Sequence, residues 1–153
     1  MVLRWLSMML LALTLSSCGI DTLYCSDQEL DEQGWMRDSW VCFDFQTSSQ
    51  GWHNASMSVF VGYTSVMAYP NLELEIKSCD KQQKIFWSDT LSINLRGVDG
   101  RWRGRTFMGR YDLMELYRTG VNFRPKADYS VAIRQLTARD TLHGVCFIGI
   151  EIK

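Results

Sequence analysis

The sequence contains few of the residues that enzymes and nucleic-acid-binding proteins depend on. Its two histidines, His53 and His143, are 90 residues apart. Neither lies in a zinc, nucleophile-elbow or phosphate-loop motif, and Glu73 and Glu75 fit a solvated strand face better than a glycosidase pair. Lysine and arginine number 16 against 17 aspartates and glutamates, a balance that does not favour nucleic acid. We therefore expect no enzymatic activity, no cofactor, no metal site and no nucleic-acid partner.

No apolar run is long enough to cross a membrane, and the one near the N-terminus has the length of a secretory signal. Residues 5–15 form an apolar stretch of eleven residues after the basic Arg4, whereas a membrane-spanning helix needs about 20. Leu15-Ser16-Ser17-Cys18 follows and matches the lipobox of bacterial lipoproteins. We therefore expect a signal peptide over residues 1–17, cleavage before Cys18, and acyl chains on Cys18 that hold the protein on a membrane.

Proline is scarce, and the chain that remains after cleavage is short. There are only two prolines, and aromatic residues make up 12% of the sequence, so a packed core is feasible. Removal of residues 1–17 leaves 136 residues, a size typical of one domain. Residues 18–38 are polar and acidic and show no period, so we expect a lipidated cysteine followed by an acidic leash. Residues 39–153 are expected to form the folded domain.

The expected domain shows the two-residue period of β-strands at many places. Segments that alternate or are apolar lie at residues 40–46, 56–63, 72–77, 84–95, 129–134 and 144–152. Turn sequences separate them, among them Val98-Asp99-Gly100, a hairpin signal. Only residues 111–118 have helical spacing, with Leu113, Leu116 and Tyr117 on one side. We therefore expect an all-β fold, an antiparallel β-sandwich of immunoglobulin-like or jelly-roll-like type, with one short helix.

The alternation also predicts which side chains form the core. These are Val41, Phe43, Phe45, Leu72, Leu74, Ile76, Val131, Ile133, Ile148 and Ile150. Tyr129 follows a turn at the start of its strand, like the tyrosine corner of immunoglobulin-like sandwiches. Cys146 shares the face of Ile148, so we expect it to be a buried free thiol. With Cys25, Cys42 and Cys79 it allows three complete disulfide pairings, and the sequence does not choose among them.

Basic residues gather in one part of the domain. Five arginines at positions 96, 101, 103, 105 and 110 lie within fifteen residues, with Trp102 among them. We expect Trp102 to fold inward over the core. For the arginines two interpretations stay open: simple solvation, or contact with phosphate headgroups, lipopolysaccharide or an acidic protein. Arg101, Arg103 and Arg105 are the candidates for such a partner contact.

A series of short motifs occurs in a fixed order along residues 40–153. They are Tyr69-Pro70-Asn71-Leu72, Asp89-Thr90, residues 100–104, residues 120–123 with Tyr129, and residues 142–145 followed by 148–152. In order and spacing they resemble the GldH gliding-motility lipoproteins of Bacteroidota, short lipoproteins with a β-rich domain. The resemblance implies a non-enzymatic component of the gliding or type IX secretion machinery. It implies contacts with other envelope lipoproteins or secretion and gliding proteins, and it carries over Cys18 as the lipidated residue.

The residues after Cys18 bear on the membrane to which the protein is sent. Gly19-Ile20-Asp21-Thr22 lacks the lysine or glutamine and clustered acids that favour export to the cell surface in Bacteroidota. It also lacks the aspartate directly after the cysteine that retains enterobacterial lipoproteins in the inner membrane. We therefore expect the outer membrane, facing the periplasm, with the acidic leash holding the domain off the membrane.

A second function stays open on the sequence alone. The domain could be a periplasmic or surface module that binds glycans or other ligands, with Trp40, Trp52 or Trp87 as stacking platforms. The two functions differ in whether the exposed surface is an aromatic groove or a mixed protein-binding patch. A small hydrolase is disfavoured, because no nucleophile and base occur in a recognisable constellation.

Overall fold

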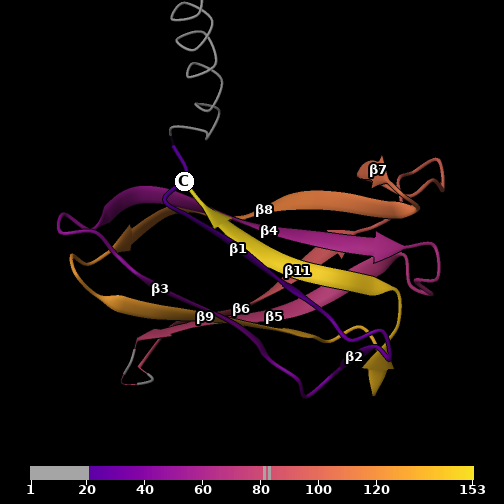
Figure 1. The fold of residues 1–153 in the computed structure, drawn as a ribbon, viewed down its shortest axis with the longest axis horizontal. Helices are drawn as coiled ribbons and strands as arrows, with labels where there is room; N and C mark the ends of the chain where they lie inside the picture. The colour runs from indigo at the N-terminus through magenta and orange to yellow at the C-terminus, as the bar shows by residue number, and fades with distance from the viewer. Residues whose placement is uncertain (1–20, 81, 83) are drawn as a thin grey trace, which may run out of the picture.

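The protein folds into two packed β-sheets (Figure 1). The computed structural model describes residues 21–80, 82 and 84–153, so the expected signal peptide and Cys18 lie outside the described residues. The strands, in chain order, are β1 (Tyr24–Glu29), β2 (Trp35–Met36), β3 (Val41–Gln46), β4 (Trp52–Thr64), β5 (Asn71–Asp80), β6 (Ile85–Asn94), β7 (Arg105–Phe107), β8 (Arg110–Phe123), β9 (Asp128–Gln135), β10 (Thr141–Leu142) and β11 (Val145–Ile152).

All strand pairs are antiparallel. The first sheet has the order β1-β11-β4-β8-β7, the second has the order β3-β9-β5-β6, and β10 pairs with β2 in a short ladder. The inner faces of the two larger sheets enclose one hydrophobic core. The expected all-β antiparallel sandwich is confirmed in this respect.

The core includes the side chains that the alternation predicts. All ten predicted core residues are buried, and β3 alternates strictly between buried and exposed positions. Tyr129 also behaves as expected, since its hydroxyl oxygen accepts a hydrogen bond of 2.9 Å from the backbone N–H of Arg124. This bond fastens the turn between β8 and β9 to the start of β9, as a tyrosine corner does.

The expected helix over residues 111–118 is wrong, because these residues belong to β8. Leu113 and Tyr117 pack against the core, whereas the side chains of Met114 and Leu116 point outward and are 52% and 59% exposed. Apolar residues on both faces of the strand hide its two-residue period. Leu113, Leu116 and Tyr117 therefore have helical spacing in the sequence without forming a helix, because sheet pairing overrides the local pattern.

The expected leash is wrong from Leu23 onward. The backbone N–H of Leu23 donates to the carbonyl of Ile152 (2.8 Å), and β1 then pairs with β11 along its whole length. Trp35 is 2% exposed and belongs to the core. The sandwich therefore begins well before residue 39. Since β1 is an edge strand that is largely exposed, its sequence is polar and carries no apolar period.

The expected position of Cys146 is also wrong. The pairing of β11 with β4 is irregular between Val145 and Phe147, so that Val145 and Ile148 are buried while Cys146 and Phe147 are half-buried. An extra residue at such a bulge moves the side chains before it to the other face. The thiol of Cys146 is free, as are those of the other three cysteines in the described residues. Its partial burial raises the pKa of the Cys146 thiol and lowers its reactivity.

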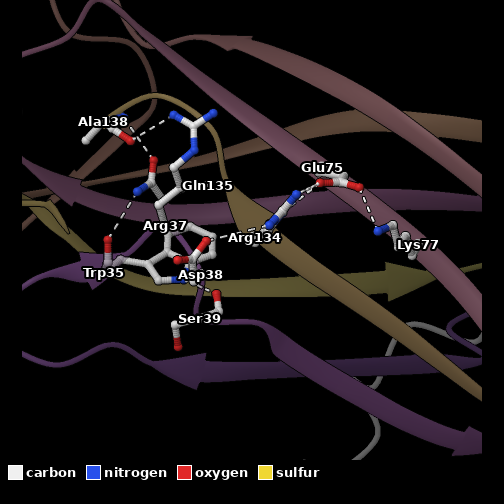
Figure 2. A network of polar contacts seen from close by, with 9 residues as sticks. All are labelled: Trp35, Arg37, Asp38, Ser39, Glu75, Lys77, Arg134, Gln135 and Ala138. Carbon is white, nitrogen blue, oxygen red and sulfur yellow. Dashed lines mark hydrogen bonds and ion pairs between the residues drawn. The ribbon is translucent and has the colours of Figure 1, made fainter. Parts of the chain in front are cut away.

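A polar network fastens residues 35–39 and β5 to β9 (Figure 2). Two guanidinium nitrogens of Arg134 each lie 2.6 Å from Oε2 of Glu75, and Nζ of Lys77 lies 2.8 Å from Oε1. Arg134 also reaches Asp38 at 3.9 Å. Buried Gln135 donates to the carbonyl of Trp35 (3.4 Å). The hydrogen bonds from Lys77 and Arg134 hold the pKa of Glu75 below its ordinary value, although partial burial opposes them.

The two ends of the sandwich carry different segments (Figure 1). At one end, which we call the β1 end, lie the start of β1, the β3–β4 loop, the β5–β6 turn and the β8–β9 turn, since Asp128 pairs with Gln46 and Tyr129 with Asp80. At the other, which we call the hairpin end, lie residues 95–104 and the β7–β8 turn, since Thr64 at the end of β4 pairs with Arg110.

Candidate functional site at the hairpin end

The first arginines lie on a tight hairpin built as the Asp-Gly signal predicts. The backbone N–H of Gly97 donates to the carbonyl of Arg101 (2.8 Å), and that of Gly100 donates to the carbonyl of Gly97 (3.0 Å). Gly100 has φ of 76°, a conformation that favours glycine. Oδ1 of Asp99 accepts from the N–H of Arg101 (3.1 Å). The turn therefore holds the backbone of Arg101 in a defined place.

Trp102 folds inward over the core, as expected. Its ring packs against Tyr63 at a centroid distance of 5.6 Å, and the guanidinium of Arg96 lies 3.9 Å from the Trp102 ring centre on the solvent side. The fully buried hydroxyl of Tyr63 lies 3.0 Å from the carbonyl oxygen of Leu95 and 2.6 Å from that of Arg103. Burial raises the pKa of Tyr63, so the neutral hydroxyl remains available to hold both strands of the hairpin.

The three candidate arginines have different surroundings. Arg103 donates to the carbonyl of Asn94 (2.7 Å) and lies 3.6 Å from Glu115, so it links β6 to β8. The side chain of Arg101 is 88% exposed, with its nearest carboxylate, that of Asp99, at 3.9 Å. Arg105 is exposed on β7 and has no ion pair within the described part of the chain. Arg101 and Arg105 are therefore available to a partner, whereas Arg103 holds the fold.

The β7–β8 turn carries an exposed apolar tip that the sequence analysis missed. Its two central residues, Met108 and Gly109, both have positive φ, 48° and 79°, as in a type I′ turn. Met108 is 89% exposed and Phe107 is 57% exposed. A left-handed conformation costs a residue such as methionine roughly 1–2 kcal/mol. The sequence signal for this turn is Gly109, the glycine at the second central position.

Further apolar side chains extend from the tip across the outer face of the first sheet. Phe60 and Phe147 pack edge to face at a centroid distance of 6.1 Å, and Phe60 is the cross-strand partner of the exposed Met114. The guanidinium of Arg110 joins this cluster to the tip, since it lies 4.8 Å from the Phe147 ring and 5.9 Å from the Phe107 ring. We call Phe60, Phe107, Met108, Met114, Leu116 and Phe147 the apolar strip.

The tryptophans proposed as glycan platforms are mostly not on the surface. Trp52 is 8% exposed and stacks on Phe45 in the core. Trp87 packs against the core and has the guanidinium of Arg118 at 5.0 Å from its ring. Trp40 borders an open hollow over β3, β9 and β5, but Lys77 and Arg134 lie 4.7 Å and 4.8 Å from its ring. An aromatic groove built from these three residues is therefore not present.

The structure is a β-sandwich that presents Arg101, Arg105 and the apolar tip of the β7–β8 turn at its hairpin end. Within residues 21–80, 82 and 84–153, no three metal-ligating side chains gather at one place. No helix in this part of the chain is long and apolar enough to span a membrane. A model of the GldH lipoprotein family matches residues 22–152. The chain belongs to the GldH lipoprotein family, which confirms the resemblance of its motifs; this family is not an enzyme family.

Similarity to other proteins is weak. No functionally curated protein matches the chain. The dimeric latent PorU from Porphyromonas gingivalis is similar with 10% identity and a TM-score of 0.38, over 91% of this chain and 13% of that one. A carbohydrate-binding module specific for non-crystalline cellulose is similar with 9% identity and a TM-score of 0.45, over 84% and 69% of the two chains. A CocE/NonD family hydrolase from Staphylococcus aureus has 11% identity and a TM-score of 0.39, over 87% and 31%. Such scores carry no argument about function.

Proposed function

We propose that the protein is a non-enzymatic accessory lipoprotein of the gliding-motility and type IX secretion machinery. Acyl chains on Cys18 anchor it in the outer membrane, and the domain faces the periplasm. The observation that carries this proposal is the match of the GldH lipoprotein family to residues 22–152. The lipobox residues are the basis for the proposed acyl anchor. The residues after Cys18 are the basis for the proposed location in the outer membrane, facing the periplasm.

In this proposal, the protein acts by binding another envelope protein through the hairpin end. Interfaces are enriched in aromatic residues, methionine and arginine, and Phe107, Met108, Arg101 and Arg105 bring these types together in exposed positions. Arg105 has no ion pair among the described residues and Arg101 has only an exposed one with Asp99 at 3.9 Å, so a partner's carboxylates meet little competition. The partner is therefore a protein surface with an apolar depression and acidic residues at its rim.

Crosslinking in intact membranes, followed by affinity purification and mass spectrometry, tests this proposal. The double variant Arg101→Glu/Arg105→Glu should lose envelope proteins that the wild type captures, and secretion or gliding should weaken. Arg139→Glu reverses an exposed arginine that lies in neither the hairpin of residues 95–104 nor the β1 end and has no ion pair among the described residues, so it should keep the partners. Thermal unfolding shows that each variant is folded. Equal capture by the double variant and by Arg139→Glu would remove the hairpin end from the proposal.

A further inference from the structure

We propose that the β1 end of the sandwich rests directly on the lipid bilayer, with Lys84, Arg124 and Lys126 at the phosphate groups of the lipids. The proposal rests on the proposed acylation of Cys18, and it replaces the expectation that a leash holds the domain off the membrane. Two independent observations support it. One is the length of chain between Cys18 and the fold, and the other is the chemistry of the β1 end.

The chain between the lipid and the fold is short. Leu23 is already fixed, because its backbone N–H donates to the carbonyl of Ile152 (2.8 Å). Four residues therefore lie between Cys18 and this fixed point, which makes five steps along the chain. A fully extended chain spans at most about 3.3–3.6 Å per residue, so the reach of this tether is roughly 17 Å.

The sandwich extends beyond the start of β1 by about the same distance. Tyr24 pairs with Ile152, and Ile152 pairs with Met57, so these three residues lie at one level. From Met57, β4 continues toward the β1 end as far as Trp52, which pairs with Phe123. Five residues of strand cover roughly 16 Å. The tether thus reaches little farther than the loops at the β1 end, which lie beyond the start of β1 in Figure 1.

The β1 end has the side chains that suit a membrane surface. Lys84, Arg124 and Lys126 are exposed, and none of them has an ion pair within the described residues. The β5–β6 and β8–β9 turns that carry them line one hollow. Leu23 and Ile85 add apolar side chains that are 43% and 56% exposed. Basic side chains bind anionic headgroups, and exposed apolar ones enter the interface.

The acidic residues of this end form no ion pair with Lys84, Arg124 or Lys126 in the described part of the chain. Oδ1 of Asp80 accepts a hydrogen bond of 2.9 Å from the backbone N–H of Lys84, and Oδ1 of Asp128 accepts one of 3.2 Å from Gln46. Both carboxylates are thus engaged within the fold, and Asp21 lies in the tether itself. When the β1 end rests on the bilayer, the hairpin end points away from the membrane, toward other proteins.

Fluorescence quenching by labelled lipids tests the orientation. The full lipidated protein is reconstituted in vesicles of phosphatidylethanolamine and phosphatidylglycerol that contain a lipid with a quencher on its headgroup. A fluorescent amino acid replaces Gln82 in the β5–β6 turn, Leu116 on the outer face of the first sheet, or Val98 at the hairpin end. We expect most of the emission to be lost at Gln82 and none at Val98 or Leu116. Quenching at Leu116 without quenching at Gln82 would mean that the sheet lies flat on the bilayer, which overturns the proposal.

Two sets of variants separate orientation from anchoring. Lys84→Glu/Arg124→Glu/Lys126→Glu should weaken the quenching at Gln82 although the protein still floats with the vesicles, whereas Arg101→Glu/Arg105→Glu should not. Cys18→Ser should abolish both flotation and incorporation of a fatty-acid analogue. If the wild type floats but Gln82 keeps its emission, the orientation is wrong and the anchor stands. If the wild type takes up no fatty acid, the proposed anchoring is wrong and the orientation fails with it.

Discussion

At the scale of single residues, two glycines on the outer face of the first sheet allow two phenylalanines to lie flat on the sheet. The ring of Phe147 covers Gly62, its cross-strand neighbour, and the ring of Phe60 covers Gly149. An aromatic ring laid over a cross-strand glycine shields backbone that would otherwise be exposed. In these two pairs, each aromatic ring on the outside of the sandwich packs closely against the sheet backbone beneath it.

The two glycines should respond differently to alanine. The three atoms nearest to a Cβ at Gly62 all belong to the ring of Phe147, a side chain that can move. The atoms nearest to a Cβ at Gly149 include the carbonyl oxygen of Ser26 in β1, at 2.7 Å. We expect Gly149→Ala to cost about 1–3 kcal/mol, as overpacking does. Gly62→Ala should cost less than about 1 kcal/mol, because reduced freedom of the unfolded chain offsets the ring movement. Urea unfolding measures both, and equal losses would show that β1 does not lie against Gly149.

Single residues also show why the sequence could not resolve the candidate site. Arg101, Arg103 and Arg105 are equivalent in the sequence, since all three are arginines and one residue separates each from the next. Their difference arises from Asn94 and Glu115, which come from β6 and β8 and meet only Arg103. Such long-range contacts leave no local pattern, so the position of the basic cluster was predictable and the role of each arginine was not.

At the scale of elements, the strands that were predicted are those with one buried face. β3 and β9 alternate strictly, because one side of each meets the core and the other meets solvent. β1 has little burial on either face, and β8 has apolar residues on both faces, so neither shows a clean alternation. β7 has only three residues, all exposed, and carries no hydrophobic signal at all. The alternating pattern therefore reveals a strand only where one face of the strand meets the core and the other meets water.

The network around Glu75, which joins β5, β9 and residues 35–39, should make stability depend on pH in acid. Because the folded-state pKa of Glu75 lies below its ordinary value of 4.5, its contribution is complete above that value and is lost as pH falls through the lowered pKa. Glu75→Gln should cost about 1–2 kcal/mol at neutral pH, a magnitude typical of charged hydrogen bonds. The difference in stability from wild type should shrink as pH falls below 4.5 and through the lowered pKa.

A matched control separates this network from general effects of charge. Glu29→Gln removes an exposed carboxylate on β1 that has no ion pair among the described residues, and it should leave the free energy of unfolding nearly unchanged. Chemical unfolding of both variants over a range of pH gives the comparison. If Glu75→Gln lowers the free energy of unfolding by the same amount down to acid pH, then packing and not ionisation stabilises this region.

At the scale of the whole molecule, the proposed tether and the proposed contact surface lie at opposite ends of the sandwich. β4 runs from the β1 end to the hairpin end over 13 residues, which is roughly 40 Å of strand. A lipid at one end and a protein contact at the other would make the domain a rigid spacer between membrane and partner. In the proposed orientation, Phe107, Met108 and Arg101 at the hairpin end point into the periplasm.

This arrangement predicts how the protein responds to protease in cells. Trypsin cleaves after basic residues in exposed turns, and Arg101 ends such a turn at the hairpin end with 88% of its side chain exposed. If the domain faces the periplasm, trypsin added to intact cells should leave the protein uncut, because the outer membrane excludes the enzyme. After the outer membrane is permeabilised, immunoblotting should show cleavage, and Arg101→Gln should remove the fragment that ends at this turn. Cleavage in intact cells would place the domain on the cell surface instead, where its partner would have to be an exported protein.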